Sequence, residues 1–114
     1  MVELSLDLDS VFGSLSSHIR RDMLRRVARE ELSVSDIAKP YRKLTFAAIS
    51  KHLKVLEKAK LIIKHRRGKE QMVRMAPEAV ANAAAYLHSY EKMWNDRLDS
   101  LEQYLSSLPP SHHG

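Results

Sequence analysis

In the first third of the chain, apolar residues recur three and four positions apart, the spacing of one face of a helix. They form two groups that predict two short helices: Val11, Phe12 and Leu15, then Ile19, Met23 and Val27. A third helix is expected over residues 34–39, because Ser33 stands three residues before Asp36 in a capping-box-like order. Pro40 disfavours helical geometry in the residue before it, so this helix has to end early.

A longer helix is expected from Phe46 to about Ala59, with Thr45 as its N-cap. On a helical wheel, one side predicts a buried apolar face: Phe46, Ile49, Leu53 and Leu56. Small and basic side chains point the other way: Ala47, Ala48, Lys51, Lys54 and Lys58. The next two segments, 61–66 and 70–75, predict strands that meet around Gly68 in a β-hairpin.

The last apolar pattern predicts a long helix from Pro77 to about Leu108. Its apolar residues form a seam: Leu87, Trp94, Leu101 and Leu108 fall seven apart, with Leu98 and Leu105 interleaved. A small domain cannot bury such a long seam, so we expect a second copy of the chain to cover it. Glu91 interrupts the seam, and the alternative is a helix that folds back on its own domain. We expect Pro109 and Pro110 to end the helix and residues 109–114 to be disordered.

Composition fits a single domain of 114 residues, with 44% hydrophobic and 29% charged residues. There is no cysteine, which excludes disulfides and thiolate metal sites. No apolar run approaches the ~20 residues needed to span a bilayer. The N-terminus lacks the basic and apolar regions of a signal peptide. We therefore expect a cytoplasmic protein without a membrane partner.

The positive charge is concentrated in the middle of the chain. Residues 42–74 carry 11 basic and 2 acidic side chains, against 6 and 7 in residues 1–41 and 2 and 5 in residues 75–114. Such a local excess is the electrostatic signature of a polyanion site. The alternative is a solvated surface with no partner, but the charge coincides with the basic-faced helix and the hairpin.

Helix, turn, basic-faced helix and basic hairpin is the order of elements in a winged helix-turn-helix. We predict a mainly α fold with about five helices and a two-stranded β-hairpin wing, in one domain over residues 1–108. Residues 79–108 would form a long dimerisation helix. In this fold the N-terminal part of the second helix meets base edges, and a basic wing suits the adjacent groove or backbone. The wheel and the hairpin predict these DNA contacts: Thr45, Ala47, Ala48, Lys51, Lys54, Arg66, Arg67 and Lys69.

The segment Ala48-Ile-Ser-Lys-His-Leu-Lys-Val-Leu-Glu-Lys-Ala-Lys-Leu61 resembles the ArsR-type (arsenic-repressor-like) family of bacterial winged helix-turn-helix regulators. The corresponding family motif is Ala-Val-Ser-Lys-His-Leu-Lys-Val-Leu-Glu-x-Ala-Gly-Leu, and the resemblance covers roughly residues 11–75. It implies a homodimer, paired through the first and last helices, on a palindromic operator. It also implies that Ser50, Lys51 and His52 lie on or beside the DNA face.

Three of these positions have a second explanation. Thr45 and Ser50 can act as a cap or a local backbone partner instead of a DNA contact. His52 lies at the edge of the predicted buried face, where a DNA contact and a helix-packing role are equally compatible with the wheel.

Lys60 replaces the glycine that usually ends this helix, which costs about 1 kcal/mol if the backbone there is left-handed.

Family members that sense soft metals carry Glu-Leu-Cys-Val-Cys-Asp where this chain has Glu31-Leu-Ser-Val-Ser-Asp36. Serine thus replaces both thiolates, and a neutral hydroxyl is a poor ligand for such metals. A second family site, on the last helix, is matched only in half by His88-Ser-Tyr-Glu91. Its other half would fall on Met75 and Pro77, which are not ligands. We therefore predict no metal site and no cofactor, with His88 and Glu91 as a surface pair.

The predicted function is sequence-specific binding of double-stranded DNA by a homodimeric transcriptional regulator, a repressor whose effector is unknown. The alternatives are a winged-helix protein–protein interaction module without DNA binding, or a metal-responsive repressor with a non-standard site. An enzyme is disfavoured, because the sequence has no Gly-rich phosphate loop, cysteine nucleophile or His-Glu-x-x-His motif. The predicted dimer interface comprises Leu87, Trp94, Leu98, Leu101 and Leu105.

Overall fold

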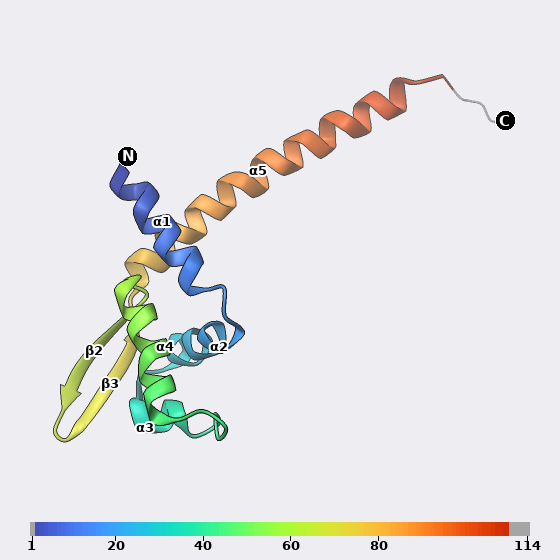
Figure 1. The fold of residues 1–114 in the computed structure, drawn as a ribbon. Coiled ribbons are helices and arrows are strands. Elements are labelled where there is room, and N and C mark those ends of the chain that lie inside the picture. Colours follow the sequence, from blue (N-terminus) through green and yellow to red (C-terminus); the bar gives the residue numbers. More distant parts are fainter. Residues whose placement is uncertain (1, 110–114) are drawn as a thin grey trace. The chain divides into compact units, whose positions relative to one another are not determined.

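The structure is a computed structural model that describes the backbone of residues 2–109 and the side chains of residues 8–109. The helices are α1 (Val2–Ser14), α2 (His18–Arg29), α3 (Val34–Ala38), α4 (Phe46–Lys58) and α5 (Pro77–Ser107). The strands are β1 (Leu32–Ser33), β2 (Ile62–Arg67) and β3 (Glu70–Met75), and the β2–β3 hairpin lies beside α4 (Figure 1). The predicted winged helix-turn-helix fold is confirmed. Of the tail predicted to be disordered, all but Pro109 lies outside the described residues.

Three helices begin at the side chains that serve as their caps. The hydroxyl of Ser17 accepts a hydrogen bond from the backbone N–H of Arg20. Ser33 accepts one from Asp36 at 3.0 Å, and Thr45 accepts one from Ala48 at 3.0 Å. Each bond satisfies an amide that the first helical turn leaves without a partner. The starts of α3 and α4 therefore follow from local sequence, as predicted.

The sheet has one strand more than the sequence predicted. β1 pairs with β3 in antiparallel register, Leu32 opposite Val73 and Ser33 opposite Met72, which gives the strand order β1-β3-β2. The predicted two-stranded hairpin wing, β2 with β3, is confirmed. The sequence did not predict β1, because a strand of two residues is too short to show an alternating pattern. β1 joins the root of the wing to the helix-turn-helix, since α3 begins at the residue that follows it.

The core lies between α1, α2, α3 and α4 and the inner ends of β2 and β3. α1 and β2 contribute Val11 and Ile62, which are 3% and 2% exposed, and the other regions contribute the most deeply buried apolar side chains: Met23, Ile37, Ile49, Leu53, Leu56, Leu61 and Val73. Leu53 and Leu56 are 1% and 0% exposed, so the predicted apolar face of α4 is confirmed at these positions. Tertiary contacts of this face fix the rotation of α4 about its own axis.

Phe46 does not belong to that buried face. Its side chain is 65% exposed, whereas Ile49, one turn further along, is 1% exposed. A helical wheel gives the direction of a side chain but not whether another element lies opposite it. Phe46 is the first residue of α4, at the edge of the apolar sector, and no core forms around it. The prediction of a buried Phe46 was wrong for this reason.

α4 ends in a Schellman motif. The backbone N–H of Lys60 bonds to the carbonyl of Glu57 at 2.9 Å, and that of Leu61 bonds to the carbonyl of Leu56 at 3.0 Å. Lys60 has a φ of 64°, the left-handed conformation that this motif requires and that glycine usually supplies. Leu61 and Leu56 are both buried, which provides the apolar contact that accompanies the motif.

The described chain divides into two compact units between Ala83 and Ala84, inside α5. We call the part up to Ala83 the body and residues 84–107 the arm. All described arm side chains are exposed in the single chain, including every predicted interface residue: Leu87, Trp94, Leu98, Leu101 and Leu105. The arm also exposes apolar side chains that the predicted seam left out: Tyr86, Tyr90, Met93 and Tyr104. Among the helices described, none is long and apolar enough to cross a membrane.

Candidate nucleic-acid interface

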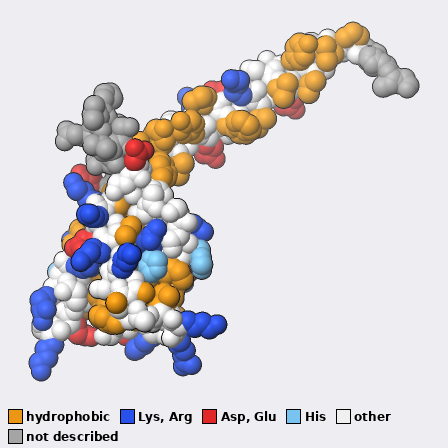
Figure 2. Space-filling view, viewed as in Figure 1, with side chains coloured by type: hydrophobic (Ala, Val, Ile, Leu, Met, Phe, Trp, Pro, Cys, Tyr) orange, Lys and Arg blue, Asp and Glu red, His pale blue; other side chains and the backbone are white. Residues whose placement is uncertain are grey.

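The side of α4 opposite its buried face carries small and basic residues. Ala47, Ser50, Lys51 and Lys54 are exposed, and Ala48 is partly buried. In Figure 2, Lys and Arg side chains gather on the body, over α4 and the wing, while the arm shows hydrophobic patches. The structure thus places the predicted α4 residues on one surface, where Lys51 and Lys54 form no ion pair with a carboxylate of the described residues.

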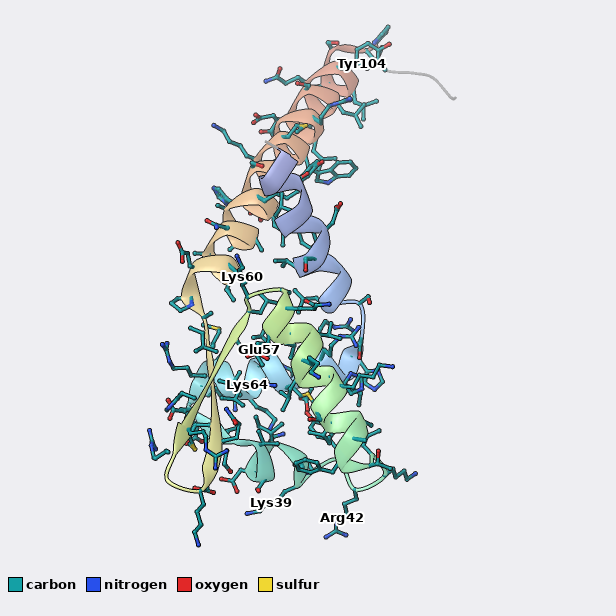
Figure 3. All side chains as sticks on the ribbon, turned by 60° about the vertical axis from the view of Figure 1, so that its left-hand side comes forward. Lys39, Arg42, Glu57, Lys60, Lys64 and Tyr104 are labelled. Atoms are coloured by element: carbon teal, nitrogen blue, oxygen red, sulfur yellow. The ribbon has the colours of Figure 1, made fainter. Side chains whose placement is uncertain are left out.

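The turn between α3 and α4 adds basic side chains that the predicted site left out. Arg42 and Lys43 are exposed, and Figure 3 shows Arg42 beside the start of α4, directed away from the body. The same view shows Lys39 on this side of the body, where its ammonium pairs with Asp36 at 2.9 Å. Arg42 and Lys43 already belonged to the basic stretch of the sequence, and that charge count was the signal for including them.

α2 holds this turn in place. The guanidinium of Arg26 donates to the carbonyls of Ile37 and Asp36 at 2.8 and 2.9 Å, and lies 5.6 Å from the centre of the Tyr41 ring. The Tyr41 hydroxyl donates to the Asp22 carboxylate at 2.5 Å. Burial and then the hydrogen bond to Asp22 raise the pKa of Tyr41, so this hydroxyl stays a donor at neutral pH. These contacts hold α3 and the beginning of the turn against α2.

His52 is tied to α2. Its Nδ1 lies 3.2 Å from a guanidinium nitrogen of Arg20, and the Nε of Arg20 donates to the Ser14 carbonyl at 2.6 Å. Since arginine can only donate, Nδ1 is the acceptor and the ring proton belongs on Nε2. Burial first, and then the charges of Arg20 and Lys51, hold the pKa of His52 below its ordinary value. His52 therefore contacts α2, as in the packing alternative that the sequence left open, and its Nε2–H remains a donor.

The wing carries three predicted DNA-binding residues, and they differ in their surroundings. Gly68, with a φ of 62°, and Lys69 form the turn between β2 and β3. Arg66 and Lys69 are exposed near this turn. Arg67 is also exposed, but its guanidinium bonds to a Glu31 oxygen at 2.7 Å, which lies 3.1 Å from His65 Nε2 as well. Arg67 thus attaches the wing to the segment before β1, a contact that the sequence did not predict.

A groove of about 540 Å³ lies on the body between α1, the end of α4, β2 and the start of α5. Apolar side chains such as Val11, Ile62 and Ala79 line much of it. Its charged residues have both signs, and Lys64 pairs with Glu57 at 3.3 Å, as Figure 3 shows between α4 and β2. The lining therefore does not favour a ligand of one charge.

Three of the positions that the resemblance connects with metals have partners of another kind. Ser33 is 3% exposed and its hydroxyl caps α3 through the Asp36 amide. His88 Nδ1 lies 3.5 Å from a Glu91 carboxylate oxygen, the surface pair that the sequence predicted. Among the described residues, no three histidine and acidic side chains are grouped as a metal ion would require.

Comparison with known proteins places the fold. The family of helix-turn-helix domains matches residues 15–65. An ArsR-like transcriptional regulator from Rhodococcus sp. RHA1 is 28% identical, with a TM-score of 0.72 over 91% of this chain and 97% of that one. A crystal structure of an ArsR family transcriptional regulator is 26% identical, with a TM-score of 0.73 over 80% of this chain and 93% of that one.

A third structure similar to this chain is a fragment, residues 1–100, of a possible ArsR-family regulator from Mycobacterium bovis. It is a homodimeric winged helix-turn-helix DNA-binding domain, 25% identical, with a TM-score of 0.62 over 99% of this chain and 92% of that one. Among curated protein sequences, none matches the chain. The resemblance to ArsR-type regulators that the sequence indicated is confirmed by these structures and the domain match.

Proposed function

We propose that this chain, a winged helix-turn-helix protein of the ArsR type, is a DNA-binding transcriptional regulator that represses a promoter as a homodimer. The proposed partner is double-stranded DNA with a palindromic operator. The proposed compartment is the cytoplasm, where a bacterial regulator meets its promoter DNA. The observation that carries the proposal is the two-sided character of α4. Its apolar side is fixed in the core through Leu53 and Leu56, and its small and basic side is open to solvent.

This arrangement suits insertion of α4 into the major groove. The exposed alanine Ala47, near the start of α4, allows its backbone to approach the groove closely. Lys51 and Lys54 are exposed one and two turns further on, within reach of phosphates or guanine edges. Arg66 and Lys69 on the wing then bind the neighbouring backbone or minor groove. His52 donates from Nε2 to a phosphate while Arg20 fixes its ring.

Two copies of the chain account for the arm. The large apolar side chains of the arm are exposed to water in the single chain, which is unfavourable. The arm of a second copy carries the same apolar side chains, so the two arms can bury each other's apolar surface. A two-fold dimer presents two α4 helices to two half-sites of the operator. These half-sites are expected to be related by symmetry and to lie one turn of the DNA double helix apart. A dimer bound over a promoter excludes RNA polymerase, which is the basis for proposing repression.

We further propose that regulation does not use a soft metal at Ser33 and Ser35. The hydroxyl of Ser33 is a buried helix cap, and replacing a thiolate by a hydroxyl removes the preferred ligand type. His88 and Glu91, which are 78% and 68% exposed as side chains, supply two donors where a zinc site usually needs four. The effector, if the protein has one, is of another kind.

The test is DNA binding by the full chain to fragments of its own promoter, followed over a range of salt concentrations. Phosphate contacts predict an association constant that falls log-linearly with salt. Lys51→Ala should weaken binding by more than about 1 kcal/mol per subunit and reduce the slope by about 1 per lost phosphate contact. Lys92→Ala is the matched control, because it removes the same charge from the arm.

Two results would count against the proposal. If no promoter fragment binds even at low salt, the protein–protein interaction module becomes the better explanation. If Lys51→Ala and Lys54→Ala together leave operator binding intact, α4 is not the DNA-reading helix.

A further inference from the structure

We propose that the first turn of α4 recognises thymine in the operator through its 5-methyl group, with Phe46 as the residue that determines this specificity. The inference rests on the proposed DNA-binding function and goes beyond it, because it names the base that the first turn selects.

Phe46 is unusual within the body. Among the large apolar side chains described there, only Phe46 and Ile63 are exposed, by 65% and 37%. Ile63 lines the groove between β2 and α1. Phe46 lies instead at the first position of α4, next to Thr45 and Ala47, which are both exposed. A phenyl ring is thus held open to solvent at the end of α4 that meets base edges in helix-turn-helix complexes.

The first turn of α4 has few hydrogen-bonding groups for a base edge. Phe46, Ala47 and Ala48 have no polar side-chain atoms, and the Thr45 oxygen already accepts the Ala48 N–H at 3.0 Å. Polar side chains begin only at Ser50 and Lys51, one turn later. A turn of this chemistry discriminates bases by apolar contact. In the major groove the 5-methyl group of thymine is the apolar feature that distinguishes one base from the others.

Affinity and selectivity then come from different residues. The ammonium groups of Lys51 and Lys54 attract the phosphates whatever the base sequence. Ala47 is small, so the helix can approach the groove while the longer Phe46 side chain reaches a methyl group. The desolvation of the ring and the methyl group is favourable only where thymine stands opposite Phe46.

The experiment uses the full chain and an operator duplex obtained by selection from genomic fragments. Each thymine of the half-site is replaced in turn by deoxyuridine, which removes the methyl group and keeps every hydrogen-bonding atom. At the position opposite Phe46, the wild-type protein should lose about fourfold in affinity per half-site, the effect of one buried methyl-sized group. The loss should be about fifteenfold when both half-sites are changed. Phe46→Ala should bind the thymine and deoxyuridine duplexes equally.

Phe46→Leu and Lys51→Ala complete the design. Leucine keeps an apolar side chain, so Phe46→Leu should retain part of the thymine preference. Lys51→Ala should weaken both duplexes by the same factor and keep the full preference. Because Phe46 is largely exposed, Phe46→Ala should unfold at the wild-type temperature, which separates a lost contact from a lost fold.

The outcomes separate this inference from the function on which it rests. Suppose that wild type binds the operator, and that each thymine-to-deoxyuridine replacement reduces the affinity of wild type and of Phe46→Ala by the same factor. Methyl recognition by Phe46 is then wrong. The inference also fails if Phe46→Ala, relative to wild type, loses the same factor of affinity for both duplexes, since the thymine preference would then persist without the ring. That result would indicate a ring inserted between bases. If wild type binds no DNA at low salt, the proposed function itself fails.

Discussion

The body and the arm use apolar side chains in opposite ways. In the body, Leu53, Leu56 and Val73 are at most 1% exposed and belong to a single hydrophobic core. In the arm, Trp94 and Leu101 are 65% and 53% exposed in the single chain. Both units contain helical apolar patterns, so the pattern alone does not determine whether a helix is buried within its own chain.

The difference lies in what stands opposite each helix. The apolar face of α4 contacts α1, α2 and β2, which belong to the same body. In the arm, residues 84–107 form one continuous helix, and one helix cannot cover its own apolar side chains. The stability of the body should therefore be a property of one chain, whereas order in the arm should depend on association.

The largest effect is expected from Leu56→Ala in the body. This substitution removes most of a fully buried side chain and leaves a cavity, so the free energy of unfolding should fall by about 2–5 kcal/mol. Denaturant unfolding followed by circular dichroism measures this change. Because the contacts are within one chain, the loss should be the same at low and high protein concentration.

Leu101→Ala is the matched control for this experiment, since it is the same substitution in the arm. Its effect should change with protein concentration, because the apolar surface that it removes is covered only in a dimer. If both variants lose the same stability at every concentration, the contrast between the body and the arm is wrong.

A smaller effect, on association, is expected from Trp94→Ala. A large aromatic side chain at the centre of an interface contributes about 2 kcal/mol or more to binding. The dimer should therefore dissociate to monomers at concentrations where wild type is dimeric, as measured by sedimentation equilibrium. Lys92→Ala, two positions away and on the other side of the helix, should leave the dimer intact. An unchanged dimer in Trp94→Ala would refute the proposed interface.

The sequence predicted well those features that depend on short stretches of chain. Ser33 and Thr45 cap their helices through bonds to residues three positions later, and the apolar side of α4 was correctly identified at Leu53 and Leu56. Such features depend on local backbone geometry and periodicity, which a single sequence contains.

The features that it missed depend on residues far apart in the chain. β1 exists because Leu32 and Ser33 pair with β3, about 40 residues away. Arg67 bonds to Glu31 across a similar separation, and Phe46 is exposed because no element lies opposite it. For the candidate site, the sequence predicted which residues share the open face of α4. Their role in DNA binding stays a prediction.

The smallest predicted effect concerns Lys60, where the body retains a backbone strain. A left-handed φ of 64° is unfavourable for a residue with a Cβ, yet the Schellman bonds of Lys60 and Leu61 and the burial of Leu61 require it. Lys60→Gly should remove this strain and raise the free energy of unfolding by less than about 1 kcal/mol, because the greater entropy of glycine in the unfolded chain offsets part of the gain. Lys60→Ala keeps the Cβ and removes the charge, so its stability should stay close to that of wild type in the same denaturant experiment. If alanine stabilises the protein as much as glycine does, charge repulsion rather than backbone strain is the cost at this position.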